Sequence, residues 1–428
     1  MKSQLRRLLL LGVGVFFLSS CGVDGSSDAE PVASPPVAES GESSGEAEAP
    51  TTPEVKEFDK VSMITQITDE VFIKNYASLN GSAALFSEAE GSLKTYCDSI
   101  GTDQELSARD AAQEQWRVTM ADVQATEMHA FGPVAENGGA LRNRVHSYDF
   151  GTLSTCGIDQ AVVLAEGDGF DISTRSINQR GMSAIEYLIF NTDLNHTCAS
   201  QVPETQSWNT RPDSERRAKR CDLAVQVAKD VAAAAKEIDV EWQAYRTGFI
   251  KQDNAGESLQ LITDGLFALD KLTKDKKINV PLGLIDECSA RTCPKLVESQ
   301  YAENSYANVR ANLLSFKKIF SGGEGFGFDD FIDNEGFPEV SLRVIENINA
   351  TVAVVDAAEV SIRAEVASIS TVADETACSN AFAAPDQPSQ LNACRLAGSI
   401  KRITDDLKID FVTIVGVMIP DSAQSDND

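Results

Sequence analysis

The sequence predicts an all-α protein built from two antiparallel helix bundles, and three observations lead to this fold class. Long stretches without Gly or Pro carry apolar residues at helical spacing. No long alternating strand pattern competes with them. Breaks rich in Gly and Pro separate the helical stretches, and those near residues 255–290 divide the helices into two groups.

Four helices are expected in chain order. The first covers residues 102–131, where Thr102 and Glu105 form a capping box and Gly132-Pro133 supplies the stop. Long Pro-free stretches predict the next two helices at residues 214–247 and 302–320.

The fourth helix is expected over residues 339–372, because apolar residues recur there at helical spacing. These residues are Leu342, Ile345, Ile348, Val352 and Val355. Before it, the glycine-rich acidic segment 322–333 is interpreted as a connector, since its spacing of oxygen ligands misses the calcium-loop signature.

The N-terminus has the pattern of a secretion signal. Residues 1–20 combine a cationic start with an apolar run too short to span a bilayer. The run ends at Cys21 in Leu-Ser-Ser-Cys, which resembles the lipobox of bacterial lipoproteins and predicts lipidation of Cys21. Gly22 follows instead of the aspartate that retains lipoproteins in the inner membrane. We therefore expect a protein that its lipid anchors to the outer membrane, facing the periplasm.

Residues 21–55 are expected to form a disordered acidic tether. From Gly22 to Glu54 there are eight acidic residues, no basic ones and no aromatic ones, so this segment cannot bury enough surface to fold. The folded body is expected to divide into an N-terminal bundle, residues 56–270, and a C-terminal bundle, residues 271–428.

The charge balance argues against a nucleic-acid partner. The 428 residues carry 37 Lys and Arg against 65 Asp and Glu, a formal net charge of −28, whereas phosphate binding needs clustered cations. Loss of the leader would take the charge to −31. Such a charge could attract cations or serve only solubility.

Nine cysteines become eight if Cys21 carries lipid, and an even set in an exported protein predicts disulfides. Eight cysteines allow 105 connectivities, and pairing of neighbours in sequence is the simplest hypothesis. The pairs would be Cys97 with Cys156, Cys198 with Cys221, Cys288 with Cys293, and Cys378 with Cys394.

Two glutamates stand where the helical pattern expects apolar residues. Glu127 follows Trp116 on one helix face at a spacing of eleven residues, and Glu186 lies in the apolar segment 181–190. A buried carboxylate must be paired or bound. One interpretation is a ligand site; the alternative is a structural ion pair with Arg117, Arg175 or Arg180.

These residues carry a resemblance to the imelysin-like family. That family pairs a Trp-to-Glu helix ending in Phe-Gly-Pro with a Gly-x-His-x-x-Glu helix. Trp116, Glu127 and the Phe131-Gly132-Pro133 sequence match the first pattern, and the segment 181–188 resembles the second. Segments 298–308 and 320–322 are similar to the family's second-half motif, so the resemblance covers roughly residues 58–420.

The resemblance implies two helical bundles with a cleft between them, in an exported and often lipid-anchored protein linked to iron uptake or other metal handling. The family is also catalogued with metallopeptidases. The matching positions place six residues at the cleft: Trp116, Arg117, Glu127, Gly181, Ser183 and Glu186.

The chain departs from the family pattern at Ser183, which stands at the histidine position of Gly-x-His-x-x-Glu. A neutral hydroxyl is a poor ligand for zinc or ferrous iron, so Glu127 and Glu186 would suit a hard cation if a metal binds at all. The chain's histidines, His129, His146 and His196, are expected at the surface or in loops. Of the three, His146 is singled out, because its loop could fold back over a cleft.

Hydrolase motifs are missing from the expected folded body. Residues 56–428 contain no His-Glu-x-x-His helix and no Gly-x-Ser-x-Gly elbow. We therefore expect a binding protein for a metal, a metal chelate or a partner protein, with iron or a hard divalent cation as the metal. The alternatives are a metal-independent scaffold that docks to an outer-membrane receptor, and a metallopeptidase.

Overall fold

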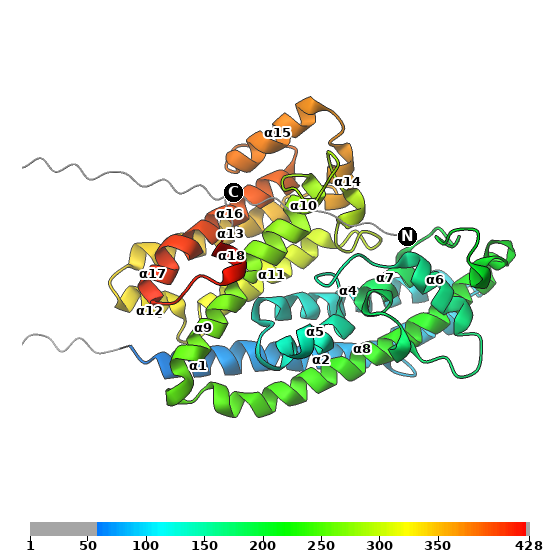
Figure 1. Ribbon diagram of the computed structural model, residues 1–428, viewed down its shortest axis with the longest axis horizontal. Coiled ribbons are helices and arrows are strands. Elements are labelled where there is room, and N and C mark those ends of the chain that lie inside the picture. The colour runs from blue at the N-terminus through cyan, green and yellow to red at the C-terminus, as the bar shows by residue number, and fades with distance from the viewer. Residues whose placement is uncertain (1–57, 425–428) are drawn as a thin grey trace, which may run out of the picture. The chain divides into compact units, whose positions relative to one another are not determined.

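The computed structural model of the chain describes residues 58–424 (Figure 1). The predicted leader, the predicted lipid on Cys21 and the predicted tether lie outside the described residues. All regular elements within residues 58–424 are helices, which confirms the all-α fold class. None of these helices combines the length and the hydrophobicity needed to cross a bilayer.

The first half of the described chain contains nine α-helices, and a π-helical turn, η1, joins α1 to α2. Their bounds are α1 Lys60–Ile67, η1 Thr68–Phe72, α2 Ile73–Ser87, α3 Ser92–Ser99, α4 Glu105–Thr126, α5 Glu136–Val145, α6 Thr155–Leu164, α7 Met182–Phe190, α8 Asp213–Phe249 and α9 Ala255–Leu266.

The second half begins with a π-helical segment, η9, and a second such segment, η11, joins α16 to α17. Their bounds are η9 Leu269–Asn279, α10 Val280–Leu282, α11 Ser305–Phe320, α12 Phe328–Asn334, α13 Pro338–Asp356, α14 Ile362–Ser368, α15 Val372–Ala383, α16 Asn392–Asp406, η11 Leu407–Phe411, α17 Val412–Val415 and α18 Asp421–Gln424.

The helices pack mainly within their own half of the chain, as Figure 1 shows. The long helix α8 packs against α2, α5 and α7, and α4 packs against α2 and α7. In the second half, α13 packs against α11 and α16. Helix α4 also packs directly against α11, so residues far apart in sequence meet along this contact. The expected division at residue 270 stays a prediction.

An aromatic cluster between α2 and α8 explains an unexpected burial. The Tyr76 ring stacks on Trp242 at a centroid distance of 5.4 Å, and the His129 ring lies 4.8 Å from Tyr76 and 4.7 Å from Phe72. His129 is fully buried, so the prediction of a surface position was wrong. Burial lowers its pKa to about 3, since the cluster disfavours a charged imidazole.

Several predicted helix boundaries need correction. Helix α4 begins at Glu105 instead of residue 102, because the Glu105 carboxylate accepts the Gly101 N–H at 2.7 Å and the predicted capping box does not form. It ends at Thr126 instead of residue 131, because a 3-10 turn, Glu127–His129, follows. The predicted helix 339–372 is two helices, α13 and α14, because Ser361 starts a new helix by accepting the Ala364 N–H. The predicted connector 322–333 contains the start of α12.

The apolar stripe on α13 was also assigned to a partly wrong face. Leu342 is 58% exposed, whereas Val344, Ile348 and Val355 are buried. The buried face is therefore rotated from the predicted one, because it follows the packing against both α11 and α16.

All eight cysteines of the described chain form disulfides, with two pairings as predicted. Cys288 pairs with Cys293, and Cys378 with Cys394. The other two predictions were wrong: Cys97 on α3 pairs with Cys221 on α8, and Cys156 pairs with Cys198. The packing of α3 against α8 brings Cys97 and Cys221 together despite 124 residues of separation.

Candidate functional site

A cavity of about 600 Å³ lies between segments from both halves of the chain. Its walls come from residues 147–153 and the start of α7 on one side, and from η9 and residues 280–301 on the other. This volume suits a small-molecule ligand, because ligand pockets typically span about 300–1,000 Å³. Ser183, Glu186 and Glu298 are polar residues in its wall.

Gly181 places the start of α7 against the end of α5. Its φ of +78° is a backbone conformation that glycine adopts readily, and a Cβ atom there would lie 2.9 Å from the carbonyl oxygen of Val145. The close approach sets Ser183, two residues after Gly181, beside His146, the residue after Val145. A side chain at position 181 would push the two segments apart.

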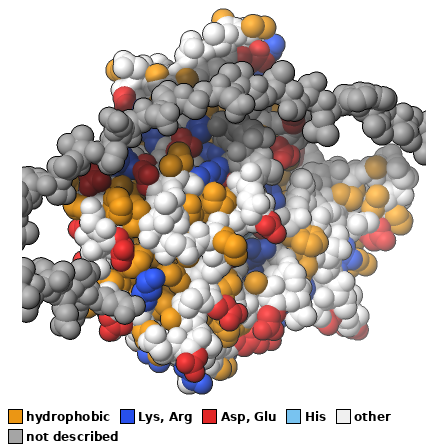
Figure 2. Space-filling view, turned by 60° about the vertical axis from the view of Figure 1, so that its left-hand side comes forward, with side chains coloured by type: hydrophobic (Ala, Val, Ile, Leu, Met, Phe, Trp, Pro, Cys, Tyr) orange, Lys and Arg blue, Asp and Glu red, His pale blue; other side chains and the backbone are white. Residues whose placement is uncertain are grey.

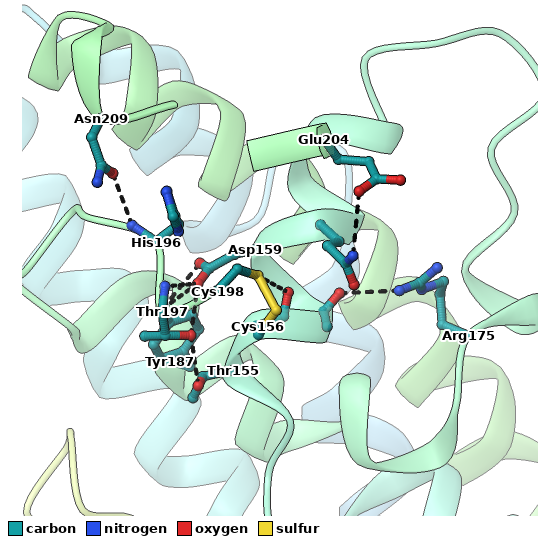
Figure 3. The surroundings of a disulfide bond; sticks show 12 residues. Thr155, Cys156, Asp159, Arg175, Tyr187, His196, Thr197, Cys198, Glu204 and Asn209 are labelled. Atoms are coloured by element: carbon teal, nitrogen blue, oxygen red, sulfur yellow. Dashed lines mark hydrogen bonds between the residues drawn. A yellow bond between two sulfur atoms is a disulfide. The ribbon is translucent and has the colours of Figure 1, made fainter. Parts of the chain in front are cut away.

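Two buried contacts fix the orientation of α7. Near its start, the indole N–H of Trp116 on α4 donates to the Met182 carbonyl oxygen at 3.0 Å. Farther along, the Tyr187 hydroxyl donates to Asp159 on α6 at 3.0 Å (Figure 3). The Cys156–Cys198 disulfide lies beside this second contact. Helix α7 is therefore held on both sides.

Glu186 is buried and accepts two backbone N–H groups from the second half of the chain. Its Oε1 atom receives the N–H of Tyr301 at 2.7 Å and of Ala302 at 3.0 Å. Burial raises the Glu186 pKa to about 7, although the two N–H donors oppose this shift. The alternative of an arginine ion pair was wrong, because no described arginine contacts this carboxylate.

Glu127 is paired with a buried lysine. It lies in the turn Glu127–His129 after α4, and its Oε2 atom is 2.5 Å from Nζ of Lys277. Asn312 on α11 also donates to Oε2, at 2.9 Å. Burial raises the Glu127 pKa, while Lys277 opposes the shift. The carboxylate is therefore paired, as its place on an apolar face required, but with a lysine instead of an arginine.

Glu298 accepts hydrogen bonds from four side chains. Its Oε1 atom accepts from His146 at 2.9 Å and Gln124 at 3.0 Å, and its Oε2 atom accepts from Asn308 at 2.9 Å and faces Lys277 at 3.2 Å. Burial opposes ionisation of this carboxyl, but Lys277 and the other donors outweigh it and lower the Glu298 pKa to about 2. Glu298 is therefore an ionised acceptor.

His146 joins Glu298 to Ser183. It is 5% exposed, and its Nδ1 atom lies 3.2 Å from the Ser183 hydroxyl while Nε2 contacts Glu298. The ionised carboxylate can only accept, so Nε2 carries a proton, and in the neutral imidazole Nδ1 then presents its lone pair to Ser183. The loop histidine that the sequence singled out thus contacts Ser183.

The structure separates some of the residues that the sequence grouped together. Glu186 and Ser183 line the large cavity, whereas Glu127 faces a separate space of about 30 Å³. Trp116 is fully buried away from the large cavity, and Arg117 pairs with Glu114 and stacks over Phe190. The expected sharing of one cation by Glu127 and Glu186 is therefore not what the geometry favours.

A different group has the spacing of metal ligands. Glu127, His146 and Glu298 offer three ligand atoms within 4.8 Å of one another, which is compatible with one ion. The contacts oppose this use, because the Lys277 ammonium already lies between the two carboxylates and His146 turns an N–H toward Glu298. As arranged, these residues hold an ammonium group and do not fit a metal ion.

Sequence reasoning did not assign Lys277, Glu298 or Asn312 to the site. Lys277 lies in a charged run, a pattern typical of solvent-exposed segments, and Glu298 stands out only as part of the segment that resembles the family's second-half motif. Lys277 and Glu298 lie at least 150 residues after Glu127 in the sequence, and only the fold brings them into contact with the site. No local sequence pattern could therefore have identified them.

The comparison with known families decides the classification. The sequence profile described as imelysin matches residues 73–399. The chain belongs to the imelysin family. Comparison with curated individual proteins gives no match.

Two solved structures share the imelysin fold with this chain. An imelysin-like protein from Psychrobacter arcticum 273-4 aligns with a TM-score of 0.62 and 15% identity, covering 84% of this chain and 96% of that one. A protein from Parabacteroides distasonis ATCC 8503, named as a putative iron-regulated protein A precursor, aligns with a TM-score of 0.56 and 15% identity, covering 84% and 97%.

Proposed function

We propose that this imelysin-family protein is a lipid-anchored, periplasm-facing binding protein of metal acquisition, which takes its metal as a small-molecule chelate. The observation that carries the proposal is the cavity of about 600 Å³ between the two halves of the chain. A single water molecule takes about 30 Å³ of liquid volume, so this space is far larger than a bare ion needs.

The site chemistry favours a chelate over a bare ion. Lys277 already pairs with the two carboxylates that have ligand spacing, and removal of this buried ammonium would leave both without their cation. A chelate brings its own metal ligands and needs only a polar cavity of the right size.

The cavity wall also offers cationic groups to an anionic chelate. Lys271, Lys276 and Lys295 line it, together with the acidic residues Glu186, Asp275, Glu287 and Glu298. On the face shown in Figure 2, acidic side chains are spread between basic and hydrophobic ones without one continuous patch. The cavity wall is mixed in charge as well, and its lysines are the groups that the carboxylates of a chelate would contact.

The lipid anchor and the choice of iron as the metal are supported by the sequence and by a similar solved structure. The lipid anchor and the periplasmic location rest on the leader and on the lipobox-like segment ending at Cys21. The iron-regulated description of the Parabacteroides distasonis protein supports iron as the first metal to test. Labelling with radioactive palmitate should mark the wild-type chain and leave a Cys21→Ser variant unlabelled.

Binding of ferric citrate, compared with bare Fe²⁺, Zn²⁺ and Ca²⁺, tests the ligand. We expect calorimetry to detect ferric citrate binding and no stoichiometric binding of the bare ions. Gly151→Phe should abolish the binding, because Gly151 lines the cavity and its position has open space for a side chain. Gly256→Phe, at an open position on α9, is the matched control.

Two results would contradict the proposal. One is tight binding of a bare ion that Gly151→Phe does not affect. The other is the absence of binding for ferric citrate and other small ferric chelates, combined with stable capture of an outer-membrane protein. The second result would favour the docking scaffold.

A further inference from the structure

Three side chains of the site form a linear hydrogen-bonded series. The Ser183 hydroxyl lies 3.2 Å from His146 Nδ1, and His146 Nε2 lies 2.9 Å from Glu298 Oε1. A nucleophile within reach of a base, with the base oriented by a third group, is the arrangement that activates serine in hydrolases. Such a triad is recognised by geometry, since its members can come from any part of a chain.

The hydrogen bonds give each group the protonation state that the chemistry needs. Glu298 is held as an acceptor by Lys277, Gln124 and Asn308, so His146 donates from Nε2. In the neutral imidazole, Nδ1 is then the unprotonated nitrogen, and it faces the Ser183 hydroxyl. The opposite tautomer would lose the contact with Glu298.

Ser183 is also placed where a substrate can reach it. It is half-buried and lines the cavity of about 600 Å³, whereas His146 behind it is almost fully buried. It lies in the first turn of α7, where the N–H groups of Ala184 and Ile185 donate to the Gly181 carbonyl oxygen. The N–H of Ser183 has no acceptor inside the helix and belongs to a residue that lines the cavity, so it can serve as a donor to an oxyanion there.

We propose that Ser183, His146 and Glu298 form a hydrolytic triad that cleaves small acyl esters bound in this cavity. Ser183 Oγ attacks the ester carbonyl carbon and its proton moves to His146 Nδ1. The carbon–oxygen bond to the alcohol breaks, and the alcohol leaves with that proton. Water then attacks the acyl-serine by the same route, which releases a carboxylic acid and restores the hydroxyl. Glu298 acts as a positioning residue through His146.

The activity uses the same cavity as the proposed chelate binding but does not depend on the ligand's identity. An ester-linked chelate would join the two functions, because its hydrolysis would weaken its hold on the metal. The tests are separate, since a reactive serine is detected without any metal or chelate.

A fluorophosphonate probe and p-nitrophenyl acetate test the triad in the full-length protein. We expect a single adduct, located at Ser183 by peptide mass spectrometry, together with ester hydrolysis that shows a burst of p-nitrophenol. Ser183→Ala should abolish both signals. Ser107→Ala should keep both, because Ser107 lies in the first turn of α4 and contacts no histidine.

Variants of the base and its partner separate catalysis from structure. His146→Gln should slow adduct formation about 100-fold or more, the usual contribution of a general base. Glu298→Gln should lower kcat and leave KM unchanged, which a general loss of structure would not do. If a variant fails to fold, the position of the adduct in the wild-type protein still shows whether Ser183 is the reactive residue.

Two outcomes would overturn the triad. The first is folded wild-type protein with neither an adduct at Ser183 nor ester hydrolysis. The second is folded His146→Gln protein that reacts at the wild-type rate. Either result leaves ferric citrate binding as a separate question.

Discussion

The Cα atom of Gly181 lies so close to Val145 that a Cβ atom added to it would come within 2.9 Å of the Val145 carbonyl oxygen. This approach sets the start of α7 beside His146. It makes position 181 the structural origin of the contact between Ser183 and His146.

Gly181→Ala should therefore lower the free energy of unfolding by roughly 2–3 kcal/mol, from the strained φ and the close contact together. Gly138→Ala is the matched control, because Gly138 also has positive φ, +70°, but has open space around it. It should cost about 1–2 kcal/mol. Urea unfolding measures both, and equal costs would show that α7 can shift without penalty.

Lys277→Met should destabilise the fold strongly, by about 3–5 kcal/mol, because it leaves the buried Glu127 and Glu298 carboxylates without their cation. Lys276→Met removes the neighbouring lysine, which pairs with Asp149 near the surface, and should cost less than about 1 kcal/mol. Chemical denaturation of both variants gives the comparison. A cost below 1 kcal/mol for Lys277→Met would mean that water or another group compensates the carboxylates.

The disulfides should differ in their contributions because they close loops of different length. Cys97 and Cys221 are 124 residues apart, and replacing both with serine should lower the free energy of unfolding by about 4–5 kcal/mol. Cys288 and Cys293 are 5 residues apart, and replacing both should lower it by about 2 kcal/mol. The free energies of unfolding of the two double variants test this order. Non-reducing peptide mapping checks the pairing itself.

The stability contribution of Glu186 should fall as pH rises from about 4.5 to 7. Its pKa is raised from 4.5 to about 7 in the folded chain, so the folded state binds more protons than the unfolded state in this window. Glu186→Gln keeps an acceptor for the N–H groups of Tyr301 and Ala302 and removes the titration. The stability difference between variant and wild type should therefore shift by roughly 3 kcal/mol across the window. Parallel stability curves would contradict the raised pKa.

The sequence located those site residues whose polarity interrupts an apolar pattern. Glu127 and Glu186 were found in this way, and both are buried as predicted. Lys277 could not be found by the same rule, because it lies among six charged residues in residues 269–279. The π-helical winding of η9 buries Lys274 and Lys277 in this run, and single-sequence patterns based on α-helical spacing do not anticipate it.

The cysteine pairs could also be predicted from the sequence only in part. Pairs close in sequence, such as Cys288 with Cys293, follow from short loops alone. The pairing of Cys97 with Cys221 depends on which helices pack together, and sequence order carries no information about that. The fold class needed only local periodicity, and for that reason it was predicted well.

The four disulfides all join residues within the same half of the described chain, either before residue 270 or after it. The opposing walls around Ser183 are consequently tied to each other by the backbone and by reversible contacts such as those of Lys277 and Glu186. No disulfide of the described chain crosses between these walls, so a change in their separation would break non-covalent contacts only.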